Sequence, residues 1–586
     1  MRGLSVGLAG LAALGWAASA LAQDVRPNVL VVLVDDAAFM DFGAYGGEAR
    51  TPVIDALAAR GALFVQHRTT PLCAPSRAML LTGLDAHQAG VATIPEVIPP
   101  EHVGQPGYTL ALEPGVTTMA SRLRAVGYQT VMAGKWHLGS GPGDLPDAHG
   151  FERSFALDAS GADNWEQKTY MPFYATAPWF EDGQPASLPD DFYSSEFLVD
   201  QLMDYLGETP GADRPFFAYL AFQAIHIPIQ VDPAYTDRYV ETYAEGWDVL
   251  RGQRRDRAAA LGFIPEAAPL APTPDRLRPW ASLTADQREL YTRSMAVNAG
   301  MLEAMDHHLG RLVDYLQAAG ALENTVILVT SDNGPEPSHP VGEPGFRLWM
   351  ALHDIEWRTE TLGERGTTAF IGPEWAFAAA SPFDLFKFYA SDGGLRVPLI
   401  AAGPGIASGI RIDSPTSVAD IAPTVMQLAG AEGAVADFTG RSLAEALSGG
   451  APAVYGADDV IGFEVSGNAA LIRGEWKLVR NLDPWGDGRW RLFNIALDPG
   501  ETTDRSQSDP EMFAEMRAAY ELWAADVGVL EMPDGYSVHR QISINALQRQ
   551  LAQYGLLLGV FALVLLGGLG LGGYWLVRRM RRRRHP

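Results

Sequence analysis

The residues with the most evident chemical potential lie in one short segment, Cys73-Ala74-Pro75-Ser76-Arg77, which is followed by an apolar run. Cys73 is the only cysteine in the 586 residues of the chain. Because proline and serine fit the first turn of a helix, we expect this cysteine at the positive end of a helix, with the charge of Arg77 about one turn further on. That end favours an anion, either a thiolate or an oxyanion of a substrate. A buried structural thiol beside a helix cap is the competing interpretation.

Two predicted strands end in oxygen-bearing side chains. Residues 29–34 form a continuous apolar run, typical of a strand buried on both faces of a mostly parallel sheet, and the run ends in Asp35 and Asp36. Residues 325–330 form a second, mostly apolar run, which ends in Ser331-Asp332-Asn333-Gly334. Open α/β sheets bind their ligands at the carboxyl ends of such strands. Three carboxylates and an amide suit Ca²⁺ or Mg²⁺ and disfavour zinc, so the sequence predicts a divalent cation site here.

Basic side chains are predicted at the same edge of the sheet. Within residues 127–139 a short strand carries Lys135 and His137, which are two residues apart and therefore lie on one side of the extended chain. Residues 215–222 form a further apolar strand that runs into His226. A lone histidine is more often a structural residue than a catalytic one, so these assignments depend on the neighbouring motifs.

Cys73-Ala74-Pro75-Ser76-Arg77 with Leu81-Thr82-Gly83 resembles the signature of the sulfatase family, in which this cysteine is oxidised to formylglycine. Residues 127–139 are similar to the family's second signature, and residues 476–479 and 497–501 to its closing subdomain. The resemblance is nearest to bacterial aryl and alkyl sulfatases. It implies an alkaline-phosphatase-like α/β fold, with a large, mixed, mostly parallel sheet flanked by helices. It also implies hydrolysis of sulfate monoesters to an alcohol or phenol and inorganic sulfate.

The resemblance further implies a role for each candidate residue. One divalent cation, Ca²⁺ in preference to Mg²⁺, would be held by Asp35, Asp36, Cys73, Asp332 and Asn333. The implied catalytic residues are Cys73, Arg77, Lys135, His137, His226 and Lys387. Of these, Arg77 and Lys135 would orient the formylglycine hydrate, and His137 would deprotonate its second hydroxyl. His226, assisted by Lys387, would protonate the leaving group, although a surface lysine is the competing interpretation of Lys387.

Two other functions stay open at this point. Phosphonate monoester and phosphodiester hydrolases of the same superfamily share the cysteine signature and the metal residues. An inactive binding module is expected if Cys73 were never converted, but the intact set of polar residues argues against it. Besides the sulfate ester substrate, the resemblance implies a formylglycine-generating maturation enzyme as a partner. The formal charge of -26 disfavours nucleic acid as a partner of the soluble part.

The chain is long enough for a large domain and a smaller one. We expect a catalytic domain over 24–450 and a C-terminal antiparallel α+β subdomain over 451–535, with strands at 469–480 and 489–494 and a helix at 510–525. Long loops at 143–200, 235–284 and 335–382, rich in proline, glycine, aromatic and acidic residues, are expected to build the substrate pocket over the strand ends. Their candidate pocket-lining aromatic residues are Trp165, Tyr170, Phe173, Phe180, Trp349 and Trp375.

Both ends of the chain carry targeting patterns. Residues 1–22 predict a signal peptide, with a basic start, an apolar core and a small-residue cleavage site. Residues 555–577 are apolar and long enough to cross a bilayer, and the arginines in 578–586 predict a cytoplasmic tail, with 536–554 as a juxtamembrane linker. Together they predict an exported enzyme on the periplasmic face of the inner membrane, crossing it once. Gly568 and Gly572 form a small-residue pair that suggests a homodimer.

Overall fold

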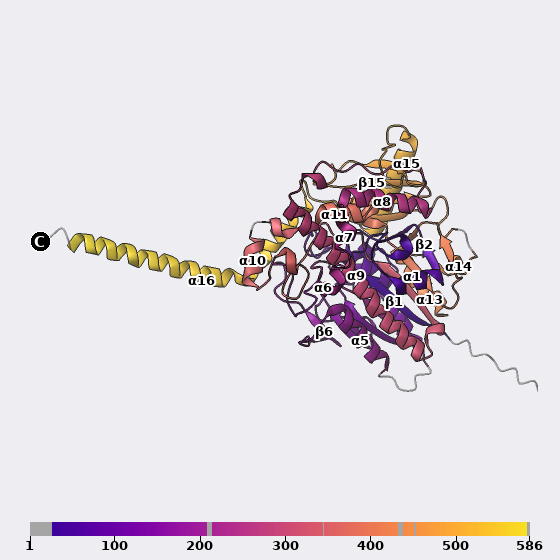
Figure 1. The fold of residues 1–586 in the computed structure, drawn as a ribbon, viewed down its shortest axis with the longest axis horizontal. Coiled ribbons are helices and arrows are strands. Elements are labelled where there is room, and N and C mark those ends of the chain that lie inside the picture. The colour runs from indigo at the N-terminus through magenta and orange to yellow at the C-terminus, as the bar shows by residue number, and fades with distance from the viewer. Residues whose placement is uncertain (1–25, 208–213, 344, 432–436, 451–452, 583–586) are drawn as a thin grey trace, which may run out of the picture.

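The computed structural model describes residues 26–207, 214–343, 345–431, 437–450 and 453–582. Figure 1 shows a body built around a large sheet, from which one long helix extends at the C-terminal end. The strands of the large sheet are β1 (Asn28–Val34), β2 (Ala62–Phe64), β4 (Gln129–Lys135), β5 (Arg153–Leu157), β6 (Trp179–Glu181), β7 (Gln184–Pro185), β8 (Phe216–Ala221), β9 (Thr325–Ser331), β10 (Leu399–Ala402) and β11 (Ile410–Ile412). A two-stranded sheet is formed by β3 (His67–Arg68) and β12 (Thr416–Ser417).

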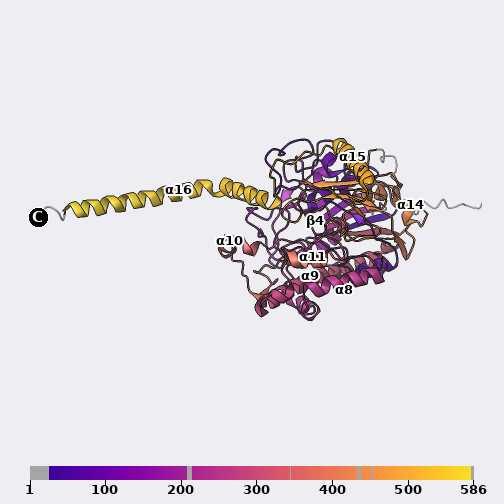
Figure 2. The ribbon, with the colours of Figure 1, turned by 90° about the horizontal axis from the view of Figure 1, so that it is seen from above.

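The helices pack around this sheet. The α-helices are α1 (Pro52–Ala59), α2 (Cys73–Thr82), α3 (Ala86–Ala89), α4 (Met119–Ala125), α5 (Ser194–Gly207), α6 (Pro233–Thr236), α7 (Val240–Tyr243), α8 (Trp247–Ala260), α9 (Ala285–Ala318), α10 (Phe346–Leu352), α11 (Gly372–Ala379), α12 (Asp392–Leu395), α13 (Ile421–Leu428), α14 (Ala444–Leu447), α15 (Pro510–Val527) and α16 (Val538–Arg582). Short 3-10 helices are η1 (Gly43–Tyr45), η2 (Pro146–His149), η3 (Trp280–Ser282), η4 (Leu322–Asn324), η5 (Pro340–Gly342), η6 (Thr359–Thr361) and η7 (Val418–Asp420). Figure 2 shows α8 and α9 together along one side of the body.

The centre of the large sheet is parallel, as the apolar runs predict. Among the described residues the strand order is β11-β2-β10-β9-β1-β8-β4-β5-β6-β7. β1 pairs in parallel with β9 on one side and β8 on the other, and β8 pairs in parallel with β4. The carboxyl ends of these four strands therefore meet at one edge of the sheet. β10 pairs antiparallel to β9, which makes the sheet mixed.

The continuous apolar run in β1 is explained by burial on both faces. Alternate side chains enter two hydrophobic cores, Leu30, Val32 and Val34 in the first and Val29, Val31 and Leu33 in the second. Side chains of α9 pack in the first core, and side chains of α2 and α13 pack in the second. A strand covered by helices on both faces has no polar face, so its first polar side chains appear where it ends.

A small antiparallel sheet follows the large domain, as predicted. Its strands are β13 (Ile461–Val465), β14 (Asn468–Arg473), β15 (Trp476–Arg480) and β16 (Arg491–Asn494), and α15 covers it through Met516 and Tyr520. The segment 469–480, predicted as one strand, is two strands because Gly474 turns the chain with a φ of 56°. The domain boundaries proposed from the sequence stay predictions.

A buried histidine joins helix α3 to the small antiparallel sheet. The ring nitrogens of His87 lie 2.9 Å from carboxylate oxygens of Asp85 and of Glu464, which belongs to β13. Burial acts to lower the pKa of His87, but the hydrogen bonds to the two carboxylates outweigh it and raise the pKa from 6.5 to about 9. His87 is therefore charged at neutral pH and links the catalytic domain to the C-terminal sheet.

We expect replacement of His87 by glutamine to lower the free energy of unfolding by roughly 3 kcal/mol at pH 6. A raised pKa makes this contribution fully present below pH 6.5, and it is lost as the pH rises through about 9. Urea unfolding of both proteins at pH 6 and pH 9.5 measures the difference, which should shrink at the higher pH. The matched control is His307→Gln at an exposed position. A difference that grows with pH would contradict the assignment.

The prediction of a membrane-spanning helix over 555–577 is wrong. Those residues belong to the continuous helix α16, which begins at Val538 and ends at Arg582. Among the described residues, no helix combines the length and the apolar character needed to cross a bilayer. The predicted single-pass topology with its cytoplasmic tail, and the predicted location on the periplasmic face of the inner membrane, depend on that span and are wrong with it. The predicted signal peptide over 1–22 lies outside the described residues.

Candidate active site

The carboxylates at the ends of β1 and β9 lie together, as expected for neighbouring parallel strands. Val34 of β1 is in register with Ser331 of β9, so the residues that follow each strand are adjacent. The amide of Asp36 donates to Oδ1 of Asp332 at 3.1 Å, and Nδ2 of Asn333 donates to Oδ1 of Asp36 at 2.6 Å. Asp36 has a φ of 67°, in the left-handed region, which turns its backbone sharply at the end of the strand.

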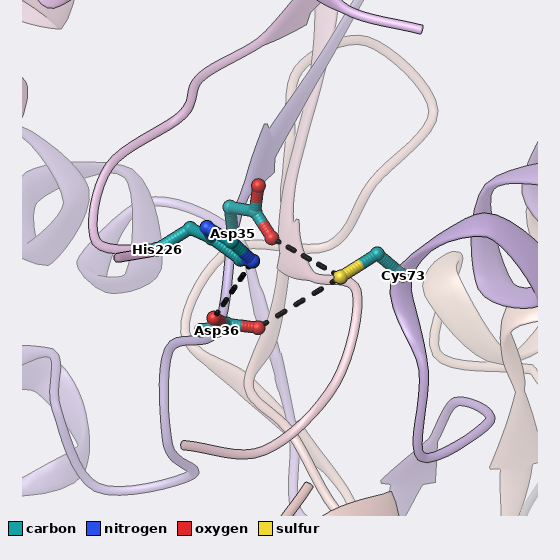
Figure 3. Close-up of side chains that lie close together, drawn as sticks. All are labelled: Asp35, Asp36, Cys73 and His226. Carbon is teal, nitrogen blue, oxygen red and sulfur yellow. Dashed lines mark hydrogen bonds and ion pairs between the residues drawn. The ribbon is translucent and has the colours of Figure 1, made fainter. Parts of the chain in front are cut away.

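Cys73 faces this group of carboxylates from the opposite side. It is the first residue of α2, and its Sγ lies 3.5 Å from Oδ1 of Asp35 and 3.9 Å from Oδ1 of Asp36. Figure 3 shows the side chains of Asp35, Asp36, Cys73 and His226 pointing toward one another. Ser76 does not cap the helix, because its Oγ accepts a hydrogen bond from the amide of Thr70.

Two basic side chains, Arg77 of α2 and Lys135 of β4, neutralise two of these carboxylates. Nε and Nη2 of Arg77 donate to Oδ2 of Asp332 at 3.0 and 2.7 Å, and its Nη1 donates to the carbonyl of Lys135 at 2.8 Å. Nζ of Lys135 donates to Oδ2 of Asp35 at 2.6 Å. All four side chains are fully buried, so these contacts hold α2, β4, β1 and β9 in one geometry.

Lys387 is not a surface lysine. Its side chain is 2% exposed, and its Nζ lies 2.7 Å from Oδ1 of Asp36 and 2.8 Å from Oε2 of Glu336. Glu336 was not predicted from the sequence. Its position three residues after Asn333, just beyond a strand end that was already singled out, was the available signal.

Two histidines complete the group. Nδ1 of His226 lies 2.5 Å from the carbonyl oxygen of Ile227, and its Nε2 lies 3.8 Å from Oδ2 of Asp36. Because a carbonyl can only accept, Nδ1 carries the proton of the neutral ring and Nε2 faces the carboxylates. In the described structure, both ring nitrogens of His137 are buried and have no hydrogen-bond partner.

Comparison with known proteins identifies the family. The family model for sulfatases matches residues 27–431. The chain belongs to the sulfatase family. An uncharacterized sulfatase of Schizosaccharomyces pombe is 32% identical over 88% of this chain and 96% of its own length, and the arylsulfatase of Klebsiella aerogenes is 35% identical over 70% and 88%. The crystal structure of Ps i-CgsB with k-i-k-neocarrahexaose aligns with a TM-score of 0.62 at 22% identity, over 89% of this chain and 98% of that one, and supports the fold.

The sulfatase is a sulfuric ester hydrolase, as the sequence predicted, and a formylglycine mechanism with a divalent cation is typical of its family. The residues present fit a cation. Oδ2 of Asp36 and Oδ1 of Asn333 are buried without a hydrogen-bond partner. Asp35, Asp36, Cys73 and His226 each offer one ligand atom, and these atoms lie within 4.8 Å of one another. Asp332 differs from the other carboxylates, because its oxygens already accept from Arg77 and from the amide of Asp36.

Burial dominates the protonation of this site. Burial and the neighbouring Asp332 raise the pKa of Asp35 to about 6, and burial raises the pKa of Asp36 to about 8 although Lys387 opposes the shift. Burial would also raise the pKa of Asp332, but the charges of Arg77 and the two lysines hold it below its ordinary value. Both pKa shifts oppose ionisation of the carboxyl groups. A positive ion between Asp35 and Asp36 would stabilise their ionised forms and relieve their mutual repulsion.

Burial lowers the pKa of both histidines well below 6.5, and the nearby lysines add to the effect. The imidazoles of His137 and His226 are therefore neutral at pH 7, the state in which a ring can exchange a proton with a substrate. Lys387 behaves in the opposite way, because Asp36 and Glu336 outweigh burial and raise its pKa well above 10.5. Lys387 therefore keeps its positive charge.

The site opens into a cavity of about 190 Å³. Cys73, His137, His226 and Lys387 line it, so the structure gives these four residues access to a common ligand. Of the predicted pocket aromatics, Tyr170 lines the cavity, whereas Trp375 is fully buried in the first hydrophobic core. Met171 lies in the loop 143–200 that was expected to build the pocket, whereas sequence reasoning missed the walls outside the expected loops, which include Ile94, Glu96, Phe388 and three residues at the start of α16.

Proposed function

We propose that the protein hydrolyses aryl or alkyl sulfate monoesters with formylglycine at position 73 as the nucleophile. This proposal is supported by the convergence of Cys73, the buried carboxylates and the buried basic side chains at a cavity with many apolar walls. The charged end suits the sulfate, and the apolar walls suit the organic part of the ester. A formylglycine-generating enzyme must act on Cys73 before the chain folds around it, because the residue is 2% exposed in the folded protein.

Arg77, Lys135 and His137 would act on the nucleophile at position 73. The side chains of Arg77 and Lys135 are locked to Asp332 and Asp35, so they can orient oxygen atoms of residue 73 without further reorganisation. His137, with both ring nitrogens free to bind a ligand, would take the proton that must leave residue 73 when sulfate is released. We assign Ca²⁺ ahead of Mg²⁺, because Ca²⁺ tolerates several oxygen ligands in flexible geometry. When bound, the cation supplies polarisation of the sulfate oxygens and neutralises the carboxylates.

The leaving-group side belongs to His226 and Lys387. Both line the cavity, and Nε2 of His226 is turned away from the Ile227 carbonyl that holds Nδ1. Because the neutral ring carries its proton on Nδ1, His226 would first take up a proton from solvent at Nε2 as the anionic sulfate ester binds, and would then hand that proton to the oxygen that departs from sulfur. Lys387, which keeps its charge between Asp36 and Glu336, would stabilise negative charge on that oxygen.

Replacing His226 with asparagine should slow the hydrolysis of esters with poor leaving groups much more than that of esters with good ones. A general acid contributes roughly 10² to 10⁴ in rate, so we expect a loss of that size for alkyl sulfates. For 4-nitrophenyl sulfate, whose phenolate leaves without protonation, the loss should be less than roughly tenfold. The measurement is kcat/KM over a series of esters of graded leaving-group acidity. The same loss for every ester would remove His226 from the role of acid.

Turnover of 4-nitrophenyl sulfate, compared with that of a phenylphosphonate monoester, tests the function itself. We expect the sulfate to be the better substrate in kcat/KM. Faster hydrolysis of the phosphonate would favour the related hydrolases of the superfamily. The mass of the peptide that carries position 73 must be measured on the same preparation, because unmodified cysteine with no turnover on either ester would indicate an unconverted protein.

A further inference from the structure

The start of α16 forms part of the active-site cavity. His539, Ile542 and Ser543 line it together with Cys73 and His226. These residues lie far beyond residue 431, where the match to the sulfatase model ends. Figures 1 and 2 show α16 leaving the body of the protein beside α10, so only the beginning of this helix is in contact with the catalytic domain.

A buried amide fixes this part of the helix to a loop of the cavity wall. Nδ2 of Asn545 donates to the carbonyls of Pro95, Glu96 and Ile98 at 3.2, 3.0 and 3.0 Å. Nε2 of Gln541 donates to Oδ1 of Asn545 at 2.8 Å, which fixes the orientation of that amide. Since Ile94 and Glu96 line the cavity, α16 holds the loop as well as contributing its own side chains.

A second loop of the cavity is held by the same helix. The guanidinium of Arg549 lies 4.1 Å from the centre of the Phe173 ring, and Nε2 of Gln550 donates to the carbonyl of Pro172. Met171, which precedes these residues, lines the cavity. Residues 538–550 therefore contact both the loop at 94–98 and the loop at 171–173 and join them to one helix.

This connected wall lies on the leaving-group side of the site. The hydroxyl of Tyr174 donates to Oε1 of Glu96 at 2.5 Å and accepts from the amide of Ser160 at 3.1 Å. Oγ of Ser160 lies 2.6 Å from the hydroxyl of Tyr170, whose ring contacts the ring of His226 edge-on at 5.6 Å. The contacts thus run from the loop that α16 holds to the proposed acid. The described ion pairs around Asp35, Asp36 and Asp332 include no residue of α16.

We propose that residues 538–550, the α16 wall, set the size of the ester that the enzyme accepts, and that Ile542 is the limiting side chain. The proposal rests on the proposed function, because it assigns this wall to the organic part of a sulfate ester. Ile542 is the apolar residue of α16 that lines the cavity, and its side chain is half-buried. A wall held by Asn545 and Arg549 at fixed positions limits size more sharply than a free loop would.

Ile542→Trp tests the wall with two esters of similar leaving-group acidity, phenyl sulfate and 2-naphthyl sulfate. We expect kcat/KM for the naphthyl ester to fall at least roughly tenfold more than for the phenyl ester. Ile542→Ala should shift the preference the other way, by roughly threefold. The control is Leu547→Trp, because Leu547 lies on the same helix and is 60% exposed. The formylglycine content of each variant is measured by mass.

Asn545→Asp provides a second test that keeps the size of the side chain. The new carboxylate has no N–H for the three carbonyls, so the loop at 94–98 should lose its attachment. We expect KM to rise for the naphthyl ester, while kcat for phenyl sulfate stays within roughly threefold. An effect on kcat alone, with unchanged selectivity, would contradict a wall.

Binding of benzenesulfonate and 2-naphthalenesulfonate, measured by calorimetry, separates the two proposals. These compounds are not hydrolysed, so the ratio of their dissociation constants reports the wall in an inactive protein too. A wild-type protein that hydrolyses neither ester would overturn the proposed function, but a ratio shifted by Ile542→Trp and not by Leu547→Trp would still support the wall. Equal effects of both tryptophans on that ratio would overturn the wall.

Discussion

Cys73→Ala is expected to abolish steady-state hydrolysis of sulfate esters, by roughly 10⁴-fold or more. Cys73→Ser is expected to allow at most one slow sulfation per enzyme, with no release. The serine would present one oxygen to sulfur beside Arg77 and the carboxylates, in the position that Cys73 occupies 3.5 Å from Asp35. After transfer, it would have no geminal oxygen through which sulfate could be expelled. Release would then require water to attack at a site built to place the nucleophile on residue 73.

Mass spectrometry of the peptide with position 73 is the necessary companion to these rates. It shows whether the wild-type cysteine has been converted, and whether serine has been modified by the maturation system of the host. For Cys73→Ser we expect a burst of one product molecule per enzyme and a sulfated serine in the mass spectrum. Many turnovers by an enzyme with unmodified serine at position 73 would defeat the mechanism.

Asp332→Asn should reduce kcat/KM by roughly 10³-fold and remove the increase in Tm that a divalent cation produces. Asparagine keeps the shape and one acceptor for Arg77, but it loses the negative charge of the carboxylate and the acceptor for the amide of Asp36. Asn is the better choice than alanine, because alanine would also remove the acceptor for Nε and Nη2 of the buried Arg77, at a cost of roughly 1–3 kcal/mol for each donor left unsatisfied. Thermal unfolding with added Ca²⁺ and with a chelator measures the cation effect, alongside activity.

Asp392→Asn is the matched control for this experiment. Asp392 is also fully buried, and it pairs with Arg68 at 2.6 Å and with Lys477 at 2.7 Å, but no ion pair or hydrogen bond among the described residues joins it to the carboxylates near Cys73. We expect this variant to lose stability and to keep the rise in Tm on cation addition. If Asp332→Asn keeps both its activity and that rise, Asp332 does not belong to the cation site.

Short sequence patterns were enough to predict the family, the central parallel sheet and the meeting of its polar strand ends. The segment around Cys73 indicated the family by its residue types alone. The apolar runs that end in Asp35 and Asp332 indicated a parallel sheet, because a strand covered on both faces shows polar side chains only at its ends. Parallel strands bring their carboxyl ends to one edge, so the meeting of Asp36 with Asn333 followed from the two patterns together. The roles of these residues stay predictions.

Contacts between distant segments were decided by the tertiary structure alone. Lys387 pairs with both Asp36 and Glu336, and Lys387 and Glu336 lie in irregular loops, where no periodicity predicts the direction of a side chain. The composition of 555–577 predicts a membrane span, whereas in the structure the segment is part of the longer helix α16, and no helix among the described residues is long and apolar enough to cross a bilayer. The start of that helix lines the active site because Asn545 finds three carbonyls of a loop more than four hundred residues earlier, a match that depends on folded geometry and has no local signature.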